Sequence, residues 1–254
     1  MFAAGRDSAA LLQYEACCFY GSSKSEKTTA LFNKSLVYKK LGYYEQSVFT
    51  LKRLLKFNPE VNLKTEIYYE LALNQYLGDS FGESLISVDS LRIFENNNLS
   101  EEASLVEIFA LNELGGYVKS SKLAEEFVNR FIPEKQKDSV MLAVKAHWNE
   151  KNFPRLKNQK TAMILSRIVP GSGQIYAGYP FEGVFNLLLQ SACLTYGIFE
   201  FWHGYYLTGY VGGISLFTKF YIGGPGRARF LVQKTNYRRT KSFNDRAVDL
   251  LIRK

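Results

Sequence analysis

The chain has 254 residues, of which 46% are apolar and 22% are charged. This composition supports a packed core and excludes a largely disordered chain. Residues 1–150 carry 17 Lys and Arg against 20 Asp and Glu, whereas residues 151–254 carry 15 against 4. The net charge of +8 therefore belongs to the second part. This asymmetry predicts two modules, the basic one facing anionic lipid or nucleic acid.

The N-terminal part shows a repeated pattern of two amphipathic helices and a turn. Asp7–Tyr20 predicts a first helix, and Leu31–Pro59 contains two apolar helical runs separated by a turn at Gly42. Two further copies have their turn glycines at Gly78 and Gly115, which gives spacings of 36 and 37 residues. A period of this length is typical of helical-pair repeats, in which each pair packs only on its neighbours.

Small residues and glycines occupy corresponding places in the copies. Ser47, Ser84 and Ser120 fall where the two helices of a pair should cross, and a larger side chain would separate them. The turn glycines are expected to allow positive φ at little cost. Lys137–Glu150 predicts a capping helix, and residues 151–160, broken by a proline, predict a linker.

These features resemble the tetratricopeptide repeat. The turn glycine Gly42, the aromatic Tyr44, the small Ser47 and the closing Pro59 stand at that family's spacings. The resemblance implies a helical solenoid over residues 1–150 that binds a protein partner on one face.

The cysteines predict no metal or disulfide chemistry. Cys17, Cys18 and Cys193 show no metal-ligand spacing, and adjacent cysteines on a helix point to different faces. We expect all three to be buried as small apolar residues.

Two apolar runs follow in residues 161–254. Gly183–Phe199 has no charged residue, Gly204–Gly224 contains only Lys219, and the aromatic turn EFWHGYY joins them. Each run is just long enough to cross a bilayer, and basic residues flank the pair on both sides but not at the turn. The pattern predicts a membrane-associated helical hairpin, with Lys219 near one end of its run. A soluble domain with two buried helices is the alternative. Phe243–Ile252 predicts a short amphipathic helix.

A glycine-rich string precedes the first run. Its positions are Pro170, Gly171, Gly173, Gln174, Tyr176 and Gly178. The proline should end the preceding helix, the first two glycines allow a sharp turn, and the glutamine and tyrosine can hydrogen-bond backbone or headgroups.

This string matches the Pro-Gly-x-Gly-Gln-x-Tyr-x-Gly pattern and resembles a short two-transmembrane domain of small bacterial membrane proteins. The later FYIGGPGRA resembles the closing segment of a bacterial subgroup that joins a periplasmic repeat region to this hairpin. The resemblance implies an envelope protein of the bacterial inner membrane. That subgroup usually begins with a secretory leader, which implies repeats outside the cytoplasm, whereas the basic flanks favour the cytoplasmic side. Both topologies stay open.

The sequence offers no catalytic constellation. His147 and His203 lie far apart, and neither neighbours a nucleophile or an acid. Phosphate-binding glycine motifs with their lysine are missing, and no cofactor, metal or small-molecule substrate is expected.

The leading hypothesis is therefore a non-enzymatic, membrane-anchored scaffold in envelope assembly or secretion. It has a protein partner on the repeats and anionic lipid at the basic flanks. The alternative is a soluble helical-repeat protein that binds nucleic acid through RARFLVQKTNYRRTK, a less favoured reading because it leaves the apolar runs unexplained.

Overall fold

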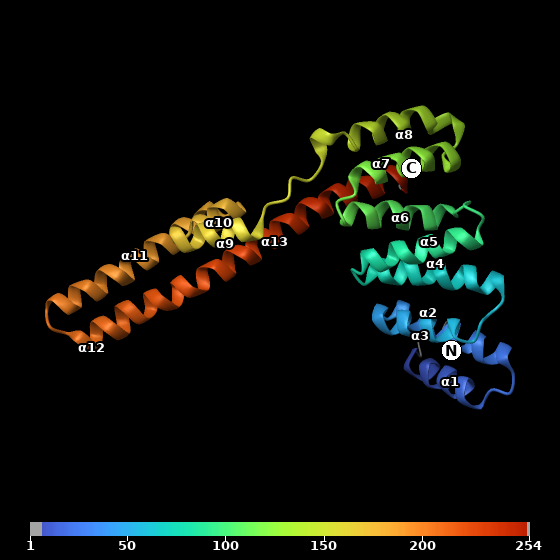
Figure 1. The fold of residues 1–254 in the computed structure, drawn as a ribbon, viewed down its shortest axis with the longest axis horizontal. Coiled ribbons are helices and arrows are strands. Elements are labelled where there is room, and N and C mark those ends of the chain that lie inside the picture. The colour runs from blue at the N-terminus through green and yellow to red at the C-terminus, as the bar shows by residue number, and fades with distance from the viewer. Residues whose placement is uncertain (1–6, 253–254) are drawn as a thin grey trace. The chain divides into compact units, whose positions relative to one another are not determined.

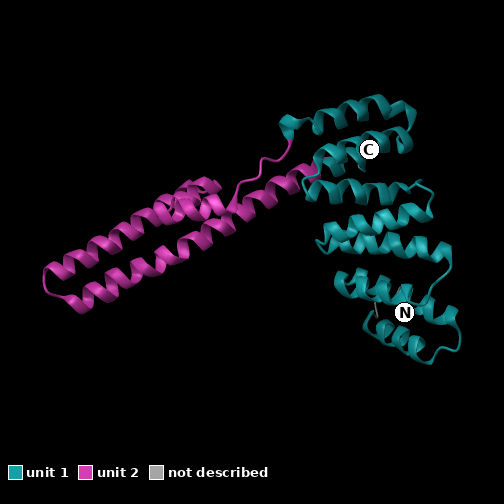
Figure 2. Ribbon diagram, viewed as in Figure 1, with its two compact units in different colours: residues 1–152, 247–254 teal, residues 153–246 magenta. Residues whose placement is uncertain are grey.

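The computed structural model describes residues 7–252, which form two compact units (Figure 2). One unit comprises residues 1–152 together with residues 247–254, and the other comprises residues 153–246. The described residues form helices and no strand, so the predicted all-α class is confirmed. The predicted division was 1–150, 151–160 and 161–254, whereas the last eight residues group with the N-terminal unit.

Eight α-helices make up most of the first unit (Figure 1). They are α1 (Asp7–Tyr20), α2 (Lys24–Lys40), α3 (Tyr44–Leu55), α4 (Val61–Leu77), α5 (Phe81–Phe94), α6 (Glu101–Glu113), α7 (Tyr117–Phe131) and α8 (Glu134–His147), followed by the 3-10 turn η2 (Glu150–Asn152). Each helix packs against the next one along the chain. Local chemistry sets several of the ends. Ser23 and Glu26, for example, form a reciprocal capping box at the start of α2.

The predicted small residues lie at helix crossings and are fully buried. Ser47 on α3 donates to the carbonyl of Ser35 on α2 at 2.9 Å, and Ser84 on α5 donates to the carbonyl of Ala72 on α4 at 2.7 Å. Both bonds span twelve residues, so the two helix pairs share one internal geometry. A larger side chain at either serine would lose this bond and meet the opposite backbone.

The turns of the three helix pairs differ from the sequence expectation at one place. Gly42 and Gly115 have φ of 76° and 77°. Gly78 instead has φ of −92°, and the left-handed residue of that turn is Asp79, with φ of 59°. Three residues join the two helices in each pair, so the connections have equal length. Gly78 is the first of these three residues, whereas Gly42, Asp79 and Gly115 are the second, and the second is the left-handed one.

Two apolar clusters form part of the core of the first unit. Leu31, Leu51, Leu54 and Ile67 are fully buried in one of them, which joins α2, α3 and α4. The second joins α4, α5 and α6 through residues such as Val88 and Leu91. These are the apolar periodic positions of the amphipathic runs, so the helices bury the stripe that their sequence pattern defines.

The second unit contains α9 (Gln159–Ile168), α10 (Ser172–Ala177), α11 (Pro180–Trp202), α12 (Tyr206–Thr208), the π-helical η3 (Gly209–Ser215) and most of α13 (Leu216–Leu251). The predicted short helix at Phe243–Ile252 is wrong as a separate element. It is the end of α13, which contains Pro225 and continues for 36 residues.

Helix α11 and η3 pack closely against each other as the two arms of a helical hairpin (Figure 1). A Cβ on Gly213 would lie 2.3 Å from the Cα of Gly197, so the two backbones meet directly. Such an approach requires glycine at 213, leaves little room for a Cβ at 197, and is typical of helix pairs in membranes.

One helix among the described residues, α11, is long and apolar enough to cross a membrane. Only 11% of its most apolar 18-residue window is buried in the protein. The run Gly204–Gly224, predicted as a second span, does not form such a helix. It is divided among α12, η3 and the beginning of α13, and it carries Lys219 and several glycines.

Candidate functional site

The glycine-rich string forms a tight turn around the short helix α10. α9 ends at Ile168, and Val169 is extended with ψ of 116°, as the residue before a proline should be. Gly171 begins α10 with φ of 88°, and Gly178 ends it with φ of 101°. Both values lie in the left-handed region, which only glycine enters without strain.

The glycines also let three helices approach one another. A Cβ on Gly171 would lie 2.0 Å from the carbonyl oxygen of Gly183 on α11. A Cβ on Gly173 would lie 2.2 Å from the carbonyl oxygen of Ala162 and 2.8 Å from the Cβ of Ala228. The string therefore holds α9, α11 and α13 together at one level.

A small apolar cluster lies beneath the turn. It contains Ala162, Ala177, Ala228, Leu231 and Val232, with two tyrosines packed against it. Alanines dominate because the backbones are too close for larger side chains.

A buried polar contact accompanies this cluster. Gln174 is 2% exposed, and its side-chain oxygen accepts a hydrogen bond from Ser166 at 3.4 Å. The glutamine thus serves packing within the protein and makes no backbone contact of the kind the sequence predicts.

Tyr176 ties the turn to the chain that precedes α9. Its hydroxyl oxygen accepts from the backbone N–H of Asn158 at 3.1 Å, and its carbonyl accepts from Lys157 Nζ at 2.6 Å. The lysine also lies over the tyrosine ring, 5.6 Å from its centre. Burial, and to a smaller extent Arg239, lowers the pKa of Lys157 below its ordinary value.

Asn236 on α13 completes the attachment. Its amide accepts from the backbone N–H of Lys157 and donates to the carbonyl of the same residue, both at 2.9 Å. Thr235 donates to the carbonyl of Ala177 at 2.9 Å. The bonds hold the segment before α9 and the end of α10 against one helix, so this end of the hairpin is fixed by polar contacts.

Charges mark the boundary between this polar end and the apolar hairpin. Arg227 on α13 donates from Nε and a terminal nitrogen to both carboxylate oxygens of Glu182 on α11, at 2.6 and 3.1 Å. Bidentate pairing fixes the register of the two helices as well as their distance.

The surface next to the site is strongly apolar. Phe181 is 91% exposed, Ile168 is 71% exposed and Ile222 is 72% exposed. At the far end of the hairpin, Trp202 and Leu207 are 87% and 78% exposed. Large apolar side chains are therefore exposed at both ends of the hairpin.

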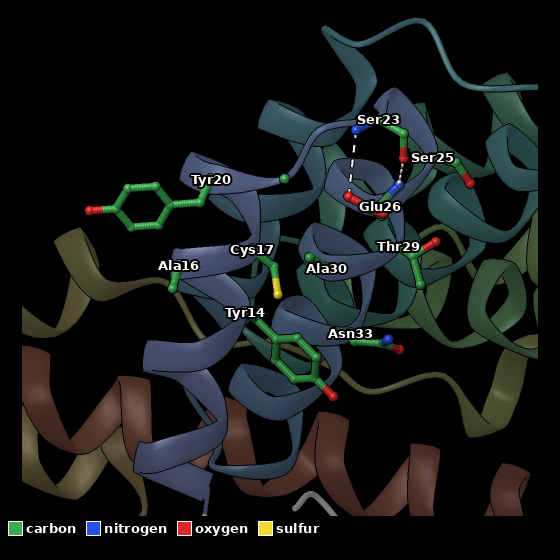
Figure 3. A pocket seen from close by; sticks show the side chains of 11 residues that line it. Tyr14, Ala16, Cys17, Tyr20, Ser23, Ser25, Glu26, Thr29, Ala30 and Asn33 are labelled. Carbon is green, nitrogen blue, oxygen red and sulfur yellow. Dashed lines mark hydrogen bonds between the residues drawn. The ribbon is translucent and has the colours of Figure 1, made fainter.

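The first unit offers a second candidate, a groove of about 830 Å³ between α1 and α2 (Figure 3). Tyr14 and Tyr20 supply aromatic surface, and Thr29 and Asn33 supply polar groups. Cys17 is exposed at this groove, Cys18 is buried and Cys193 is half-buried. The expectation that all three cysteines are buried is therefore confirmed for Cys18 alone. It is wrong for Cys17, which lies on the groove side of α1, and Cys193 is buried only in part.

Neither location shows catalytic or metal-binding geometry. Among the described residues, no group of three His, Cys, Asp or Glu side chains could hold a metal ion. The polar groups of the turn mainly bond one another, so what this arrangement does chemically is to fasten helices together.

Several residues of the turn could not be found from the motif alone. Lys157 and Asn236 lie 79 residues apart, and no pattern links them. Gly183 is a further case, because its close approach to Gly171 depends on the fold. A local signal existed only for Asn158, whose side chain caps α9 just before its first turn.

Comparison with known proteins adds no relative. No family model matches the chain, and no curated protein or solved structure is significantly similar to it. Over residues 7–252 the protein is all-helical apart from its connections, and one of these helices is a candidate membrane span.

Proposed function

We propose that the chain is a non-enzymatic, membrane-anchored scaffold of the bacterial envelope, acting in envelope assembly or secretion. Tetratricopeptide-like helical repeats bind a protein segment, and the hairpin of α11 with η3 and α13 holds them at the inner membrane. The observation that carries the proposal is the exposed apolar surface of the second unit, above all along α11. Contact with lipid tails costs an apolar surface no free energy, whereas contact with water is unfavourable.

The ends of the hairpin support the membrane part. Its turn carries Trp202 and Tyr205, which favour the lipid–water interface, and its other end carries the Glu182–Arg227 pair. Between Glu182 and Glu200 lie 17 uncharged residues, or ~26 Å of helix, close to the hydrocarbon thickness of a bilayer. Basic residues beyond Arg227 are then placed to meet anionic headgroups.

The shared geometry of the helix pairs supports the repeat part. Ser47 and Ser84 make the same bond across twelve residues, and the left-handed turn residues Gly42, Asp79 and Gly115 recur after 37 and 36 residues. The groove at α1 and α2 has the size and aromatic lining to take a peptide segment.

Flotation tests the anchor. Full-length protein mixed with phosphatidylcholine–phosphatidylglycerol vesicles should float with them and resist extraction at high salt or alkaline pH. A chain that stays monodisperse in plain buffer, and sediments apart from the vesicles, would contradict the proposal. Salt-sensitive RNA binding by that soluble chain would favour the alternative function.

Capture in mild detergent tests the scaffold. The wild-type chain should retain one defined protein partner, and Tyr20→Ser, which removes aromatic surface from the groove, should reduce its recovery. Ile93→Ser is the matched control, because Ile93 is 77% exposed on α5 and does not line the groove. Equal recovery with both variants would place the binding face elsewhere. Protease accessibility in intact cells and in spheroplasts decides on which side the repeats lie.

A further inference from the structure

Lys219 is the one charged residue between Gly204 and Gly226. It is exposed on α13, and within residues 7–252 it makes no ion pair. Its neighbours Phe220 and Ile222 are exposed apolar residues. Burying a lone charged amine in a membrane costs free energy, so a lysine among such residues points to a functional contact.

Two contacts fix the depth of Lys219 in the hairpin. Arg227 pairs with Glu182 at one end, and Gly213 meets Gly197 further along. Lys219 lies eight residues from Arg227 and fifteen from Gly204, which correspond to ~12 and ~22 Å of helix. Lys219 lies five residues before Gly224, toward the end of its run as the sequence predicts, and α13 continues for about two turns from Lys219 to Arg227.

The direction of the side chain makes escape to the nearer interface unfavourable. Cα–Cβ bonds of a helix tilt toward its N-terminus. The N-terminal end of α13 faces the hairpin turn, so Lys219 leans toward the more distant interface and away from Arg227. To reach the headgroups on the Arg227 side, the lysine stem has to turn back against this tilt.

The surface around Lys219 is shaped for a close neighbour. Four exposed residues follow one another at spacings of four, four and three, which puts them on one face: Ser215 at the end of η3, then Lys219, Gly223 and Gly226 on α13. A Cβ on Gly223 or Gly226 would meet no atom within 4 Å. These glycines do no packing within the chain, and small residues on an exposed helix face let another helix approach closely.

A second copy of this chain does not supply the counter-charge. In the hairpin, Glu182 is already paired with Arg227. Glu200 lies near the turn, about nine residues of helix, or ~13 Å, from the level of Lys219. A copy with the same topology would hold both carboxylates at those same depths.

We propose that this face of α13 docks a membrane-spanning helix of another protein, whose Asp or Glu pairs with Lys219 about one third of the way into the bilayer. The inference rests on the proposed membrane insertion of the hairpin. The partner helix would carry a carboxylate and would lie against the small residues of this face.

Host peptides test the pairing. Full-length chain with a donor dye on its N-terminal amine is placed in phosphatidylcholine vesicles with an acceptor-labelled Leu/Ala transmembrane peptide. The peptide carries one Glu at the depth of Lys219, one Gln there, or one Glu shifted by two helical turns. Energy transfer should show the matched Glu peptide binding about tenfold more tightly than the other two.

Variants of the full chain sharpen the test. Lys219→Met should abolish the preference for Glu, and Lys219→Glu should reverse it toward a peptide with Lys at that depth. Lys241→Met, at another exposed lysine of α13, should change nothing. Equal binding of Glu and Gln peptides by a chain that floats with the vesicles overturns the pairing alone. A chain that does not float overturns the membrane anchor, and the pairing with it.

Discussion

The two units treat apolar side chains in opposite ways. In the first unit, Leu31, Leu51 and Ile67 are fully buried. In the second unit, the buried residues are mostly Gly and Ala, whereas Phe181 and Trp202 are almost fully exposed. The first unit is stabilised by removing large side chains from water. The second is held by close backbone packing and polar bonds, and many of its large apolar side chains stay exposed.

The largest expected effect comes from the close packing of the second unit. Gly173→Ala places a Cβ 2.2 Å from a backbone oxygen, and because backbone cannot move aside cheaply, we expect a loss of at least ~3 kcal/mol or a failure to fold. Gly223→Ala is the matched control, since its Cβ meets open space and helix propensity should make it neutral or up to ~1 kcal/mol stabilising. Thermal unfolding in detergent measures both. Equal melting temperatures for the two alanine variants would contradict the close packing around Gly173.

The first unit should show a smaller effect at its helix crossings. Ser84→Leu replaces a fully buried serine, so we expect overpacking and a lost hydrogen bond to cost about 2–4 kcal/mol. Ser90→Leu, on the half-exposed side of the same helix, should cost less than about 0.5 kcal/mol. Urea unfolding followed by Trp148 fluorescence, in a Trp202→Phe background, reports on this unit. Equal urea midpoints for the two leucine variants would show that the crossing at Ser84 is not tightly packed, and would contradict the contrast drawn between the units.

Buried charge gives a third test, one that depends on pH. Burial raises the pKa of Glu107 above the ordinary value near 4.5, although Arg92 lies 2.6 Å away. The folded protein therefore binds this proton more tightly than the unfolded chain, and the free energy of unfolding gains from this group as the pH falls toward 4.5. Glu107→Gln should lose that gain, an effect smaller than either packing change.

The control for this test has the opposite sign. Hydrogen bonding to Lys52 lowers the pKa of the exposed Glu83, so its contribution to stability is present above the ordinary pKa and is lost below it. Urea midpoints of wild type, Glu107→Gln and Glu83→Gln across this pH range separate the two. Parallel curves for wild type and Glu107→Gln would show that Glu107 titrates normally in the folded protein.

The same contrast explains which features the sequence could predict. Helix α1 and the serine crossings follow from periodicity and residue size, which are local properties. The continuity of α13 could not be predicted, because Pro225 and its neighbouring glycines read as a break. In the turn, Gly171 and Gly173 were identifiable, but their contacts with Gly183 and Ala228 depend on chain segments brought together only by folding.

The smallest expected effect concerns the displaced turn residue. Asp79 has φ of 59°, a region that costs a residue with a Cβ more than it costs glycine. Asp79→Gly should therefore stabilise the first unit by about 0.5 kcal/mol, whereas Gly42→Ala, at the corresponding place in the preceding turn, should destabilise it by about 1 kcal/mol.

Gly78→Ala tests which residue holds the left-handed position of this turn. The backbone of Gly78 has a negative φ that alanine can adopt, and the added Cβ would make moderately tight contacts at 3.2 and 3.3 Å. If Gly78→Ala costs as much as Gly42→Ala while Asp79→Gly gives nothing, the left-handed position belongs to the glycine after all. The opposite result would show that this unit keeps its turn geometry even where the glycine has moved out of register, since the backbone at that position is set by the helices that the turn connects.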